Sequence, residues 1–249
     1  MQTTGNTILI TGGTSGIGLA FALEFLRLGN KVIICGRRKD RLENIQRSHP
    51  QIIIKSCDVA IAEEREELAS WTINNHPDIN ILINNAGIQL VTDLSKPVVL
   101  KRVEEEVAIN FIAPVHLSSL FSTHLAGKVN AAIITVSSGL AFVPLAFMPV
   151  YCATKAAIHS FCLSMRYQLK NTSIKVFEIA PPSVDTELGH DRRADKSQTH
   201  GGMPIAEFLA EAMEAIKNDL LEAPISHAKN LQDKRESLFE IMNSRITNQ

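Results

Sequence analysis

Tyr151 and Lys155 are the residues whose types and spacing most directly indicate acid–base chemistry in this chain. They lie four positions apart at the start of a helical pattern, so both side chains are expected on one helix face. A phenol has a pKa of about 10, and a neighbouring ammonium group lowers it by favouring the phenolate. Tyr151 could therefore exchange a proton with a substrate oxygen near neutral pH. The same spacing occurs by chance on many helix surfaces, so the pair needs support from other residues.

Ser138 supplies that support, because it lies 13 positions before Tyr151 and directly after an apolar run. Its hydroxyl could bind the substrate oxygen that the phenol protonates. Ser137 is the competing serine at this point. The segment Val129–Thr154 carries no charged residue, but two prolines and several polar side chains argue against an uninterrupted membrane-spanning helix. We interpret it as a buried strand followed by a loop that lines a pocket, and we predict no membrane span.

A glycine-rich turn, Thr11-Gly12-Gly13-Thr14-Ser15-Gly16-Ile17-Gly18, joins a short apolar run to a helical pattern near the amino terminus. Glycines allow the backbone to turn tightly and to approach a phosphate closely. The following helix offers unpaired N–H groups and the positive end of its dipole. The T-G-x-x-x-G-x-G spacing therefore predicts a phosphate-binding turn, although such a cluster alone could equally be a structural turn.

Short β-branched runs alternate with amphipathic stretches, which is typical of βαβ units in a parallel sheet. We predict strands at Thr7–Ile10, Lys31–Cys35, Ile52–Ser56, Ile79–Ile83, Ala131–Ser137 and Ile174–Ile179, with a last weak strand at Ala223–Ser226. Helical patterns lie at Ile17–Leu28, Lys39–Ser48, Glu63–Asn75, Val98–Leu125, Tyr151–Lys170, Ile205–Leu221 and Asn230–Arg245. The predicted fold class is α/β: one Rossmann domain over residues 1–249, with a doubly wound parallel sheet of about seven strands and helices on both faces.

Further motifs follow the predicted strands in order: Asp58-Val59 after the third, Asn84-Asn85-Ala86-Gly87 after the fourth, Ser138 after the fifth and Pro181 to Thr186 after the sixth. Together with the glycine turn, Asn110 and the Tyr151-x-x-x-Lys155 pair, they resemble the short-chain dehydrogenase/reductase family from Thr7 to Thr186. The resemblance implies hydride transfer between a nicotinamide cofactor and a carbonyl or secondary alcohol. It assigns catalysis to Ser138, Tyr151, Lys155 and Asn110. In that family the lysine also binds the nicotinamide ribose, and the asparagine holds a water that links the lysine to solvent.

The same resemblance implies where the cofactor binds. The glycine turn would lie against the cofactor, the residues after the third strand near the adenine, those after the fourth near the ribose, and those after the sixth at the nicotinamide. The implied cofactor-binding residues are Gly12, Thr14, Ser15, Gly16, Ile17, Gly18, Arg37, Arg38, Asp58, Val59, Asn85, Ala86, Gly87, Tyr151, Lys155, Pro181, Val184 and Thr186.

NADP(H) is the predicted cofactor, with NAD(H) as the alternative, because the second predicted strand ends in Cys35-Gly36-Arg37-Arg38. An NAD site usually places a carboxylate here, whereas the 2′-phosphate of NADP needs a cation. The first carboxylate, Asp40, already lies in the next helix. Arg37 offers a planar fork suited to a phosphate, and Arg38 offers a second donor or a stacking plane for adenine. Two solvated arginines at a helix start are the alternative interpretation.

The substrate is not indicated by any convergent pair of charged residues. We expect Gln89–Val91, the largely apolar segment Gly139–Val150 and the polar loop Glu187–Pro204 to select it, with residues 187–225 forming a substrate-loop or lid region. Two features depart from the family: Pro181-Pro182 replaces the usual Pro-Gly, and the chain ends in a predicted helix. This C-terminal part loosely resembles a bacterial branch of oxidoreductases linked to D-alanylation of lipoteichoic acid.

Composition limits the expected partners. The 25 Lys and Arg balance 26 Asp and Glu, so we expect a small carbonyl or alcohol substrate and no nucleic-acid or membrane partner. Four cysteines and eight histidines show no metal-ligand spacing, so we predict no metal site, and reduced cysteines in the cytoplasm.

Three alternatives and expectations remain open on the sequence. Long apolar helices at Val107–Gly127 and Tyr151–Lys170 pair across a two-fold axis in the family, which implies a homodimer or homotetramer. A protein of this fold that senses NADP(H) without turnover is the alternative function. An epimerase or dehydratase that acts on a nucleotide sugar is the alternative enzymatic function.

Overall fold

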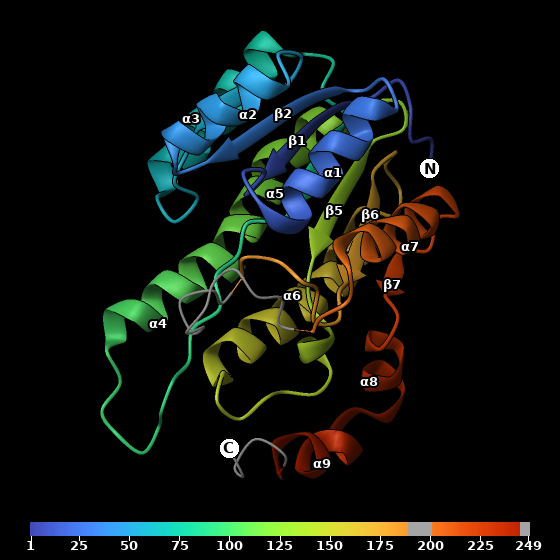
Figure 1. Cartoon of the computed structure of the whole chain (residues 1–249). Coiled ribbons are helices and arrows are strands. Elements are labelled where there is room, and N and C mark those ends of the chain that lie inside the picture. The colour runs from blue at the N-terminus through green and yellow to red at the C-terminus, as the bar shows by residue number, and fades with distance from the viewer. Residues whose placement is uncertain (189–200, 245–249) are drawn as a thin grey trace.

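The computed structural model describes residues 1–188 and 201–244, and a parallel sheet of seven strands forms its centre (Figure 1). The strands are β1 (Thr7–Thr11), β2 (Lys31–Gly36), β3 (Ile53–Ser56), β4 (Ile81–Asn84), β5 (Ala132–Val136), β6 (Lys175–Ala180) and β7 (Glu222–Pro224). Their order across the sheet is β3-β2-β1-β4-β5-β6-β7, and all neighbouring pairs are parallel. The chain starts in the middle of the sheet and winds outward in both directions, which confirms the predicted doubly wound Rossmann fold.

Helices cover both faces of this sheet. One face carries α1 (Gly16–Arg27), α2 (Lys39–Ser48) and α7 (Ile205–Lys217), and the other carries α3 (Ala62–Asn75), α5 (Ala113–Leu125) and α6 (Pro149–Gln168). On the first face, Phe21 of α1 packs against Phe208 of α7. On the second, Phe121 of α5 packs over Leu9 and Ile133. Because alternate residues of each strand face opposite layers, these strands are apolar on both sides.

The long helix between β4 and β5 contains a π-helical turn at the predicted catalytic asparagine. It consists of α4 (Leu100–Val107), the π turn Ala108–Ile112 and α5, which together span nearly the whole Val98–Leu125 helix predicted from periodicity. Asn110 is the central residue of the turn and is almost fully buried. A π turn adds one residue to a helical turn, and such turns are frequent at functional sites.

The C-terminal region departs from its prediction. The periodicity predicts one helix at Asn230–Arg245, but the structure has α8 (Ala228–Lys234), a 3₁₀ turn (Arg235–Leu238) and α9 (Phe239–Ser244). Arg235 has a φ of +45°, which a right-handed helix cannot contain. The bend brings three partly buried side chains onto an apolar cluster that includes Phe142 and Val143; they are Leu231, Leu238 and Met242.

Other differences from the predicted elements are short. The fourth strand begins at Ile81 rather than Ile79. Before it, the side chain of Asn80 takes the place of a backbone carbonyl and accepts from Thr7 N at 3.0 Å. The last strand ends at Pro224 rather than Ser226, which has a φ of +50°. Residues 189–200 of the predicted substrate loop and residue 245 of the last helix lie outside the described residues. Among the described helices, none has the length and hydropathy that a bilayer crossing requires.

The parallel arrangement gathers the predicted site residues at one edge of the sheet. The glycine turn follows β1, the two arginines follow β2, the Asn85 segment follows β4, and Ser138 follows β5. The strand order reverses between β1 and β4, and open α/β sheets bind their ligands in the crevice at this point.

Candidate active site

Lys155 and Tyr151 lie together near the start of α6, with both side chains buried. Pro149 occupies the first turn of this helix, where its missing N–H has no intrahelical partner to lose. The Lys155 Nζ atom lies 5.6 Å from the centroid of the Tyr151 ring and donates a 3.0 Å hydrogen bond to the carbonyl oxygen of Val136. Burial lowers the pKa of Lys155 to about 8, with Glu178, Cys162 and Glu106 acting in the opposite direction. The arrangement places a titratable cation beside the phenol.

Ser138 begins the 3₁₀ turn Gly139–Ala141 after β5. Its hydroxyl oxygen accepts from Leu140 N at 3.1 Å, which caps this turn. The turn packs against α6, and Leu140 and Tyr151 belong to one apolar cluster. Gly139 N also donates to Pro181 O at 2.8 Å, which joins the ends of β5 and β6. The structure therefore positions Ser138 and Tyr151 on adjoining elements.

Asn110 connects the π turn with the segment after β4 and with α6. Its side-chain oxygen accepts from Ile88 N at 2.9 Å, and its side-chain nitrogen donates to Ile88 O at 2.9 Å and to Thr154 Oγ1 at 3.2 Å. A Cβ on Gly87 would lie 3.4 Å from Asn110 Oδ1 and 3.8 Å from Lys155 Nζ. Asn110 and the Lys155 ammonium thus both lie near Gly87, and Asn110 fixes the segment that separates them.

The glycine turn is closed by the residues that follow β4. Gly12 has a φ of +66°, and a Cβ there would lie 2.8 Å from Ala86 Cα. A Cβ on Gly18 would lie 2.4 Å from both Gly12 O and the Asn85 side-chain nitrogen. That nitrogen donates to Thr11 O at 3.0 Å and to Gly12 O at 3.3 Å. The side-chain nitrogen of Asn85 therefore supports the glycine turn, and the predicted contact of Asn85 with a ribose stays a prediction.

Comparison with known proteins decides the family. Residues 6–197 match the short chain dehydrogenase family. The chain is 46% identical to the uncharacterized oxidoreductase DltE of Bacillus subtilis (strain 168), over 98% of this chain and 99% of that protein. This chain is a member of the short-chain dehydrogenase family.

Solved structures agree with the fold of this short-chain dehydrogenase. A short chain dehydrogenase/reductase from Burkholderia phymatum in complex with NAD superposes with a TM-score of 0.83 and 18% identity, over 98% of this chain and 97% of that chain. A short chain dehydrogenase from Burkholderia cenocepacia J2315 in complex with NADP gives a TM-score of 0.81 and 22% identity, over 100% and 98% of the two chains. The predicted family and its loosely predicted bacterial branch are both confirmed by these comparisons.

The two arginines after β2 point to different partners in this dehydrogenase. Arg37 Nη1 lies 3.2 Å from Glu105 Oε1 and 3.8 Å from Asp58 Oδ2. Arg38 Nη2 instead donates to Thr14 Oγ1 at 3.4 Å and approaches Ser15 Oγ at 3.5 Å. Burial lowers the pKa of Arg38 from its usual value, although an arginine remains charged at neutral pH. Arg38 is therefore the cation that reaches the glycine turn.

The remaining predicted cofactor residues lie around the same edge. Asp58 Oδ1 accepts from Ala60 N at 3.0 Å, and Val59 is buried with its carbonyl oxygen accepting from Arg65 at 2.6 Å. A Cβ on Gly16 would lie 3.3 Å from Thr186 Cβ, so the segment after β6 reaches the start of α1. Pro181 and Val184, the other predicted cofactor-binding residues of this segment, are buried.

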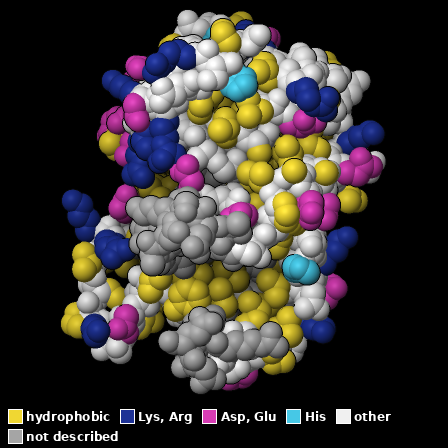
Figure 2. All heavy atoms as spheres, viewed as in Figure 1, with side chains coloured by type: hydrophobic (Ala, Val, Ile, Leu, Met, Phe, Trp, Pro, Cys, Tyr) yellow, Lys and Arg dark blue, Asp and Glu magenta, His cyan; other side chains and the backbone are white. Residues whose placement is uncertain are grey.

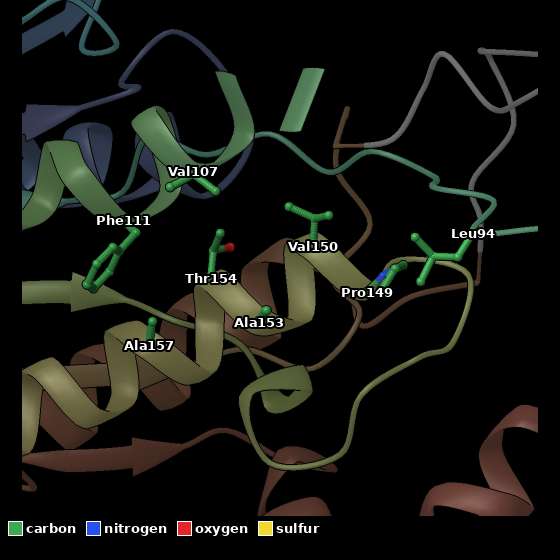
Figure 3. A pocket seen from close by; sticks show the side chains of 8 residues that line it. All are labelled: Leu94, Val107, Phe111, Pro149, Val150, Ala153, Thr154 and Ala157. Carbon is green, nitrogen blue, oxygen red and sulfur yellow. The ribbon is translucent and has the colours of Figure 1, made fainter. Parts of the chain in front are cut away.

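Two apolar hollows flank α6. The first, of about 370 Å³, is drawn in Figure 3 and is lined by Leu94, Val107, Phe111, Pro149, Val150, Ala153, Thr154 and Ala157. Ser138 and Tyr151 do not line it, so it is not the place where their chemistry would occur. The second, of about 360 Å³, is lined by Leu140, Leu145, Cys152 and Phe239 among others, and therefore borders the neighbours of Ser138 and Tyr151 in the sequence. Figure 2 shows apolar side chains gathered in this lower part of the molecule.

Three further residues organise the site and were not among the predicted site residues. Thr11 Oγ1 accepts from Asn85 N at 3.0 Å and from Ala86 N at 3.1 Å. Thr154 binds both Asn110 and the Tyr151 carbonyl oxygen. Glu106 is buried and accepts from Leu90 N at 2.9 Å, and burial raises its pKa. Its position four residues before Asn110 would have indicated a charged group on the same inward helix face.

Proposed function

We propose that this chain is an NADP(H)-dependent oxidoreductase that transfers a hydride between nicotinamide and a carbonyl or secondary alcohol of a small substrate. One observation carries the proposal. The buried Lys155 ammonium lies 5.6 Å from the Tyr151 ring centroid and binds Val136 O, two residues before Ser138. A proton donor, a cation and a hydroxyl are thereby held at the carboxyl edge of a dinucleotide-type sheet. We propose Ser138, Tyr151, Lys155 and Asn110 as the catalytic set.

The residues at the edge of the sheet fit a dinucleotide. A Cβ on Gly12 or Gly18 would clash with the residues that close the turn, so the tight turn requires glycine at both positions, and α1 presents its N-terminus directly after it. Arg38 lies beside the turn hydroxyls of Thr14 and Ser15. These groups could hold a pyrophosphate and one further phosphate, and Val184 and Thr186 complete the proposed site toward the nicotinamide end. The bound nicotinamide supplies or accepts the hydride.

Within this proposal the protein supplies proton transfer and orientation. Tyr151 donates its phenolic proton to the substrate oxygen during carbonyl reduction and takes a proton back during alcohol oxidation. Lys155 favours the phenolate when it is charged. Ser138 stabilises the substrate oxygen through its hydroxyl. Asn110 orders the polar surroundings of Lys155 through its bonds to Ile88 and Thr154.

A preference for NADP(H) is supported by the charges after β2. Arg38 reaches the glycine turn, and Arg37 lies at the same edge but is engaged by Glu105. A carboxylate that would hold the two ribose hydroxyls of NAD is absent from the end of β2, which reads Cys35-Gly36 before the arginines. Use of NAD(H) as a second cofactor remains within the proposal.

A homo-oligomer is also proposed, formed by a second copy of the chain. The hollow between α4 and the start of α6 is lined almost entirely by apolar side chains, and Ile112 of the neighbouring π turn is 45% exposed. Four buried, unpaired cysteines support a reducing compartment such as the cytoplasm for this single-domain enzyme.

The decisive experiment is a panel of small carbonyl compounds and secondary alcohols, followed at the absorbance band of NADPH with NADH in parallel. We expect turnover with NADPH for at least one member, abolished in the Tyr151→Phe enzyme. Tight NADPH binding without turnover across a broad panel would instead support an NADP(H) sensor of the same fold. Absence of binding to either cofactor would refute both functions.

A further inference from the structure

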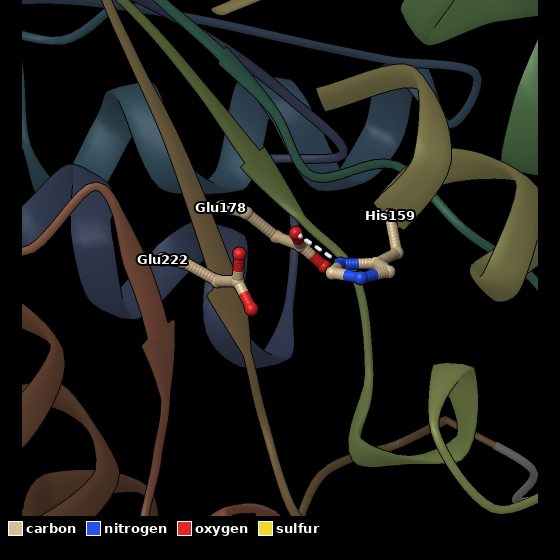
Figure 4. Close-up of side chains that lie close together, drawn as sticks. All are labelled: His159, Glu178 and Glu222. Atoms are coloured by element: carbon tan, nitrogen blue, oxygen red, sulfur yellow. Dashed lines mark hydrogen bonds and ion pairs between the residues drawn. The ribbon is translucent and has the colours of Figure 1, made fainter. Parts of the chain in front are cut away.

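A histidine and two glutamates meet beneath α6, on the side of the sheet's last two strands. His159 belongs to α6, Glu178 to β6 and Glu222 to β7. Glu178 and Glu222 are paired in the register of the two parallel strands, so their side chains leave the same face. One ligand atom from each of the three residues lies within 4.8 Å of the others. Figure 4 shows the two carboxylates and the imidazole ring directed toward one another.

Glu178 is the deepest member of the cluster, with no exposed surface. His159 Nδ1 lies 2.8 Å from Glu178 Oε2, which satisfies one of its carboxylate oxygens. The other, Oε1, is buried without a hydrogen-bond partner among the described residues. An unpartnered carboxylate oxygen in the interior is costly, so a cation bound at Glu178 Oε1 would stabilise this side chain.

In the part of the chain that the structure describes, no hydrogen-bond donor reaches Glu178 Oε1. Arg166 lies 3.9 Å from Glu222 Oε2, beyond hydrogen-bond distance. Its guanidinium donates instead to Val176 O at 3.1 Å and Leu221 O at 2.8 Å. Glu222 Oε1 accepts from Gln232. Two carboxylates side by side on adjacent strands repel each other, and a protonated His159 would place a positive charge beside Glu178 Oε2 at 2.8 Å.

We propose that His159, Glu178 and Glu222 form a binding site for a divalent transition-metal cation of the Zn²⁺ type. One imidazole and two carboxylates are ligands that Zn²⁺ accepts, and a water could complete the coordination. The side chains of His159 and Glu222 are 14% and 26% exposed, which gives a cation access from solvent. The cation would replace the proton between His159 and Glu178 and would fasten α6 to β6 and β7, one helical turn beyond Lys155. This inference does not depend on the proposed oxidoreductase function.

Isothermal titration calorimetry of the chelator-treated, desalted full chain with ZnCl₂ tests the proposal directly. We expect one Zn²⁺ per chain and no comparable binding of Mg²⁺, which prefers oxygen ligands and retains its waters. Glu222→Gln and His159→Gln should each weaken Zn²⁺ binding at least about tenfold. Both glutamines retain a polar side chain of similar length, and far-UV circular dichroism verifies that the variants fold. Glu207→Gln, an exposed change on α7, is the matched control and should leave Zn²⁺ binding unchanged.

Proton release gives a second readout of the part that His159 plays in binding. The hydrogen bond to Glu178 raises the pKa of His159, against the opposing effects of burial and Arg235. Titrations at pH 6.5 in two buffers of different ionisation enthalpy should therefore show a net release of protons when Zn²⁺ binds. The His159→Gln variant should lose this release. No Zn²⁺ binding by the parent chain, or equal affinity in parent, Glu222→Gln and His159→Gln proteins, would overturn the proposal.

Discussion

The Lys155 ammonium donates a 3.0 Å hydrogen bond to the carbonyl oxygen of Val136, so the proposed catalytic cation is fastened to the last residue of β5. Ser138 follows two residues later, and Tyr151 lies one helical turn before Lys155 on α6. The bond therefore fixes the spacing between the strand end and the helix that carry the three groups. Burial of the ammonium disfavours its charged form and lowers the pKa of Lys155 to about 8.

Because burial of the charged Lys155 destabilises the folded protein, we expect Lys155→Met to raise the free energy of unfolding at pH 7. The pKa of Lys155 falls from 10.5 to about 8, which corresponds to roughly 3 kcal/mol at a pH below both values. Loss of the bond to Val136 O offsets about 1–3 kcal/mol of this gain. Urea unfolding at pH 7 should therefore show a free energy of unfolding about 1 kcal/mol higher in Lys155→Met than in the parent.

The pH dependence distinguishes this cause from better packing. Between pH 8 and 10.5 the unfolded chain binds the Lys155 proton more tightly than the folded one, so the parent gains stability as pH rises through this range. The advantage of Lys155→Met should shrink over the same range. Lys217→Met, at an exposed lysine of α7, is the control and should show no such trend. A difference between Lys155→Met and parent that is constant from pH 7 to 10 would contradict the burial argument.

Cofactor preference should depend more on Arg38 than on Arg37. Arg38 contacts the glycine-turn hydroxyls, whereas Arg37 is paired with Glu105 at 3.2 Å. Loss of a charge-assisted hydrogen bond to a phosphate weakens binding by about 10- to 100-fold. We expect Arg38→Ala to raise the Kd for NADPH by that factor and to leave the Kd for NADH nearly unchanged. Arg37→Ala should have a smaller effect.

Calorimetric titration of NADPH and NADH into the parent and both variants measures these constants. The NADH measurement is the internal control, because it lacks the 2′-phosphate but shares every other contact. If Arg38→Ala weakens both cofactors equally, Arg38 supports the glycine turn rather than the phosphate. If only Arg37→Ala loses NADPH affinity, the side chains exchange roles when the cofactor binds.

Local patterns in the sequence predict the elements and the central motifs because both depend on neighbouring residues. Each of these motifs consists of residues that lie within a few positions of one another: the glycine turn, the pair Tyr151 and Lys155, and the strand runs. The structure has strands and helices at the predicted places. The periodicity also predicts the helix at Val98–Leu125, but not its π turn. The side chain of Asn110 in this turn bonds to Ile88, 22 residues away, and no local pattern contains that contact.

Contacts set by strand register could not be predicted in the same way. His159, Glu178 and Glu222 are far apart in the sequence and meet only because β6 and β7 pair in a particular register beneath α6. The directions of Arg37 and Arg38 likewise depend on which carboxylates and hydroxyls the neighbouring elements present. The break at Arg235 arises from packing on Phe142, which overrides the helical periodicity of the last segment.

Asn110 should contribute measurably to stability as well as to the site. Asn110→Ala removes two bonds to the Ile88 backbone and one to Thr154, and leaves buried partners unsatisfied. We expect a loss of about 2–3 kcal/mol in the free energy of unfolding by urea, together with weaker NADPH binding. Asn75→Ala removes one exposed bond to Trp71 O and should cost less than about 0.5 kcal/mol. Equal, small losses in both variants would show that the Ile88 segment is held by other contacts.

Assembly should respond to a charge placed in the hollow between α4 and α6. Ala157 lines this hollow, which is apolar apart from Thr154, so an arginine there would have to bury its charge against a second copy. Sedimentation equilibrium at micromolar concentration should show a dimer or tetramer for the parent and a shift toward monomer for Ala157→Arg. Ala206→Arg on the exposed face of α7 introduces the same charge elsewhere and should leave the assembly unchanged. A parent chain that sediments only as a monomer, or an Ala157→Arg variant that assembles like the parent, would exclude this hollow as the interface.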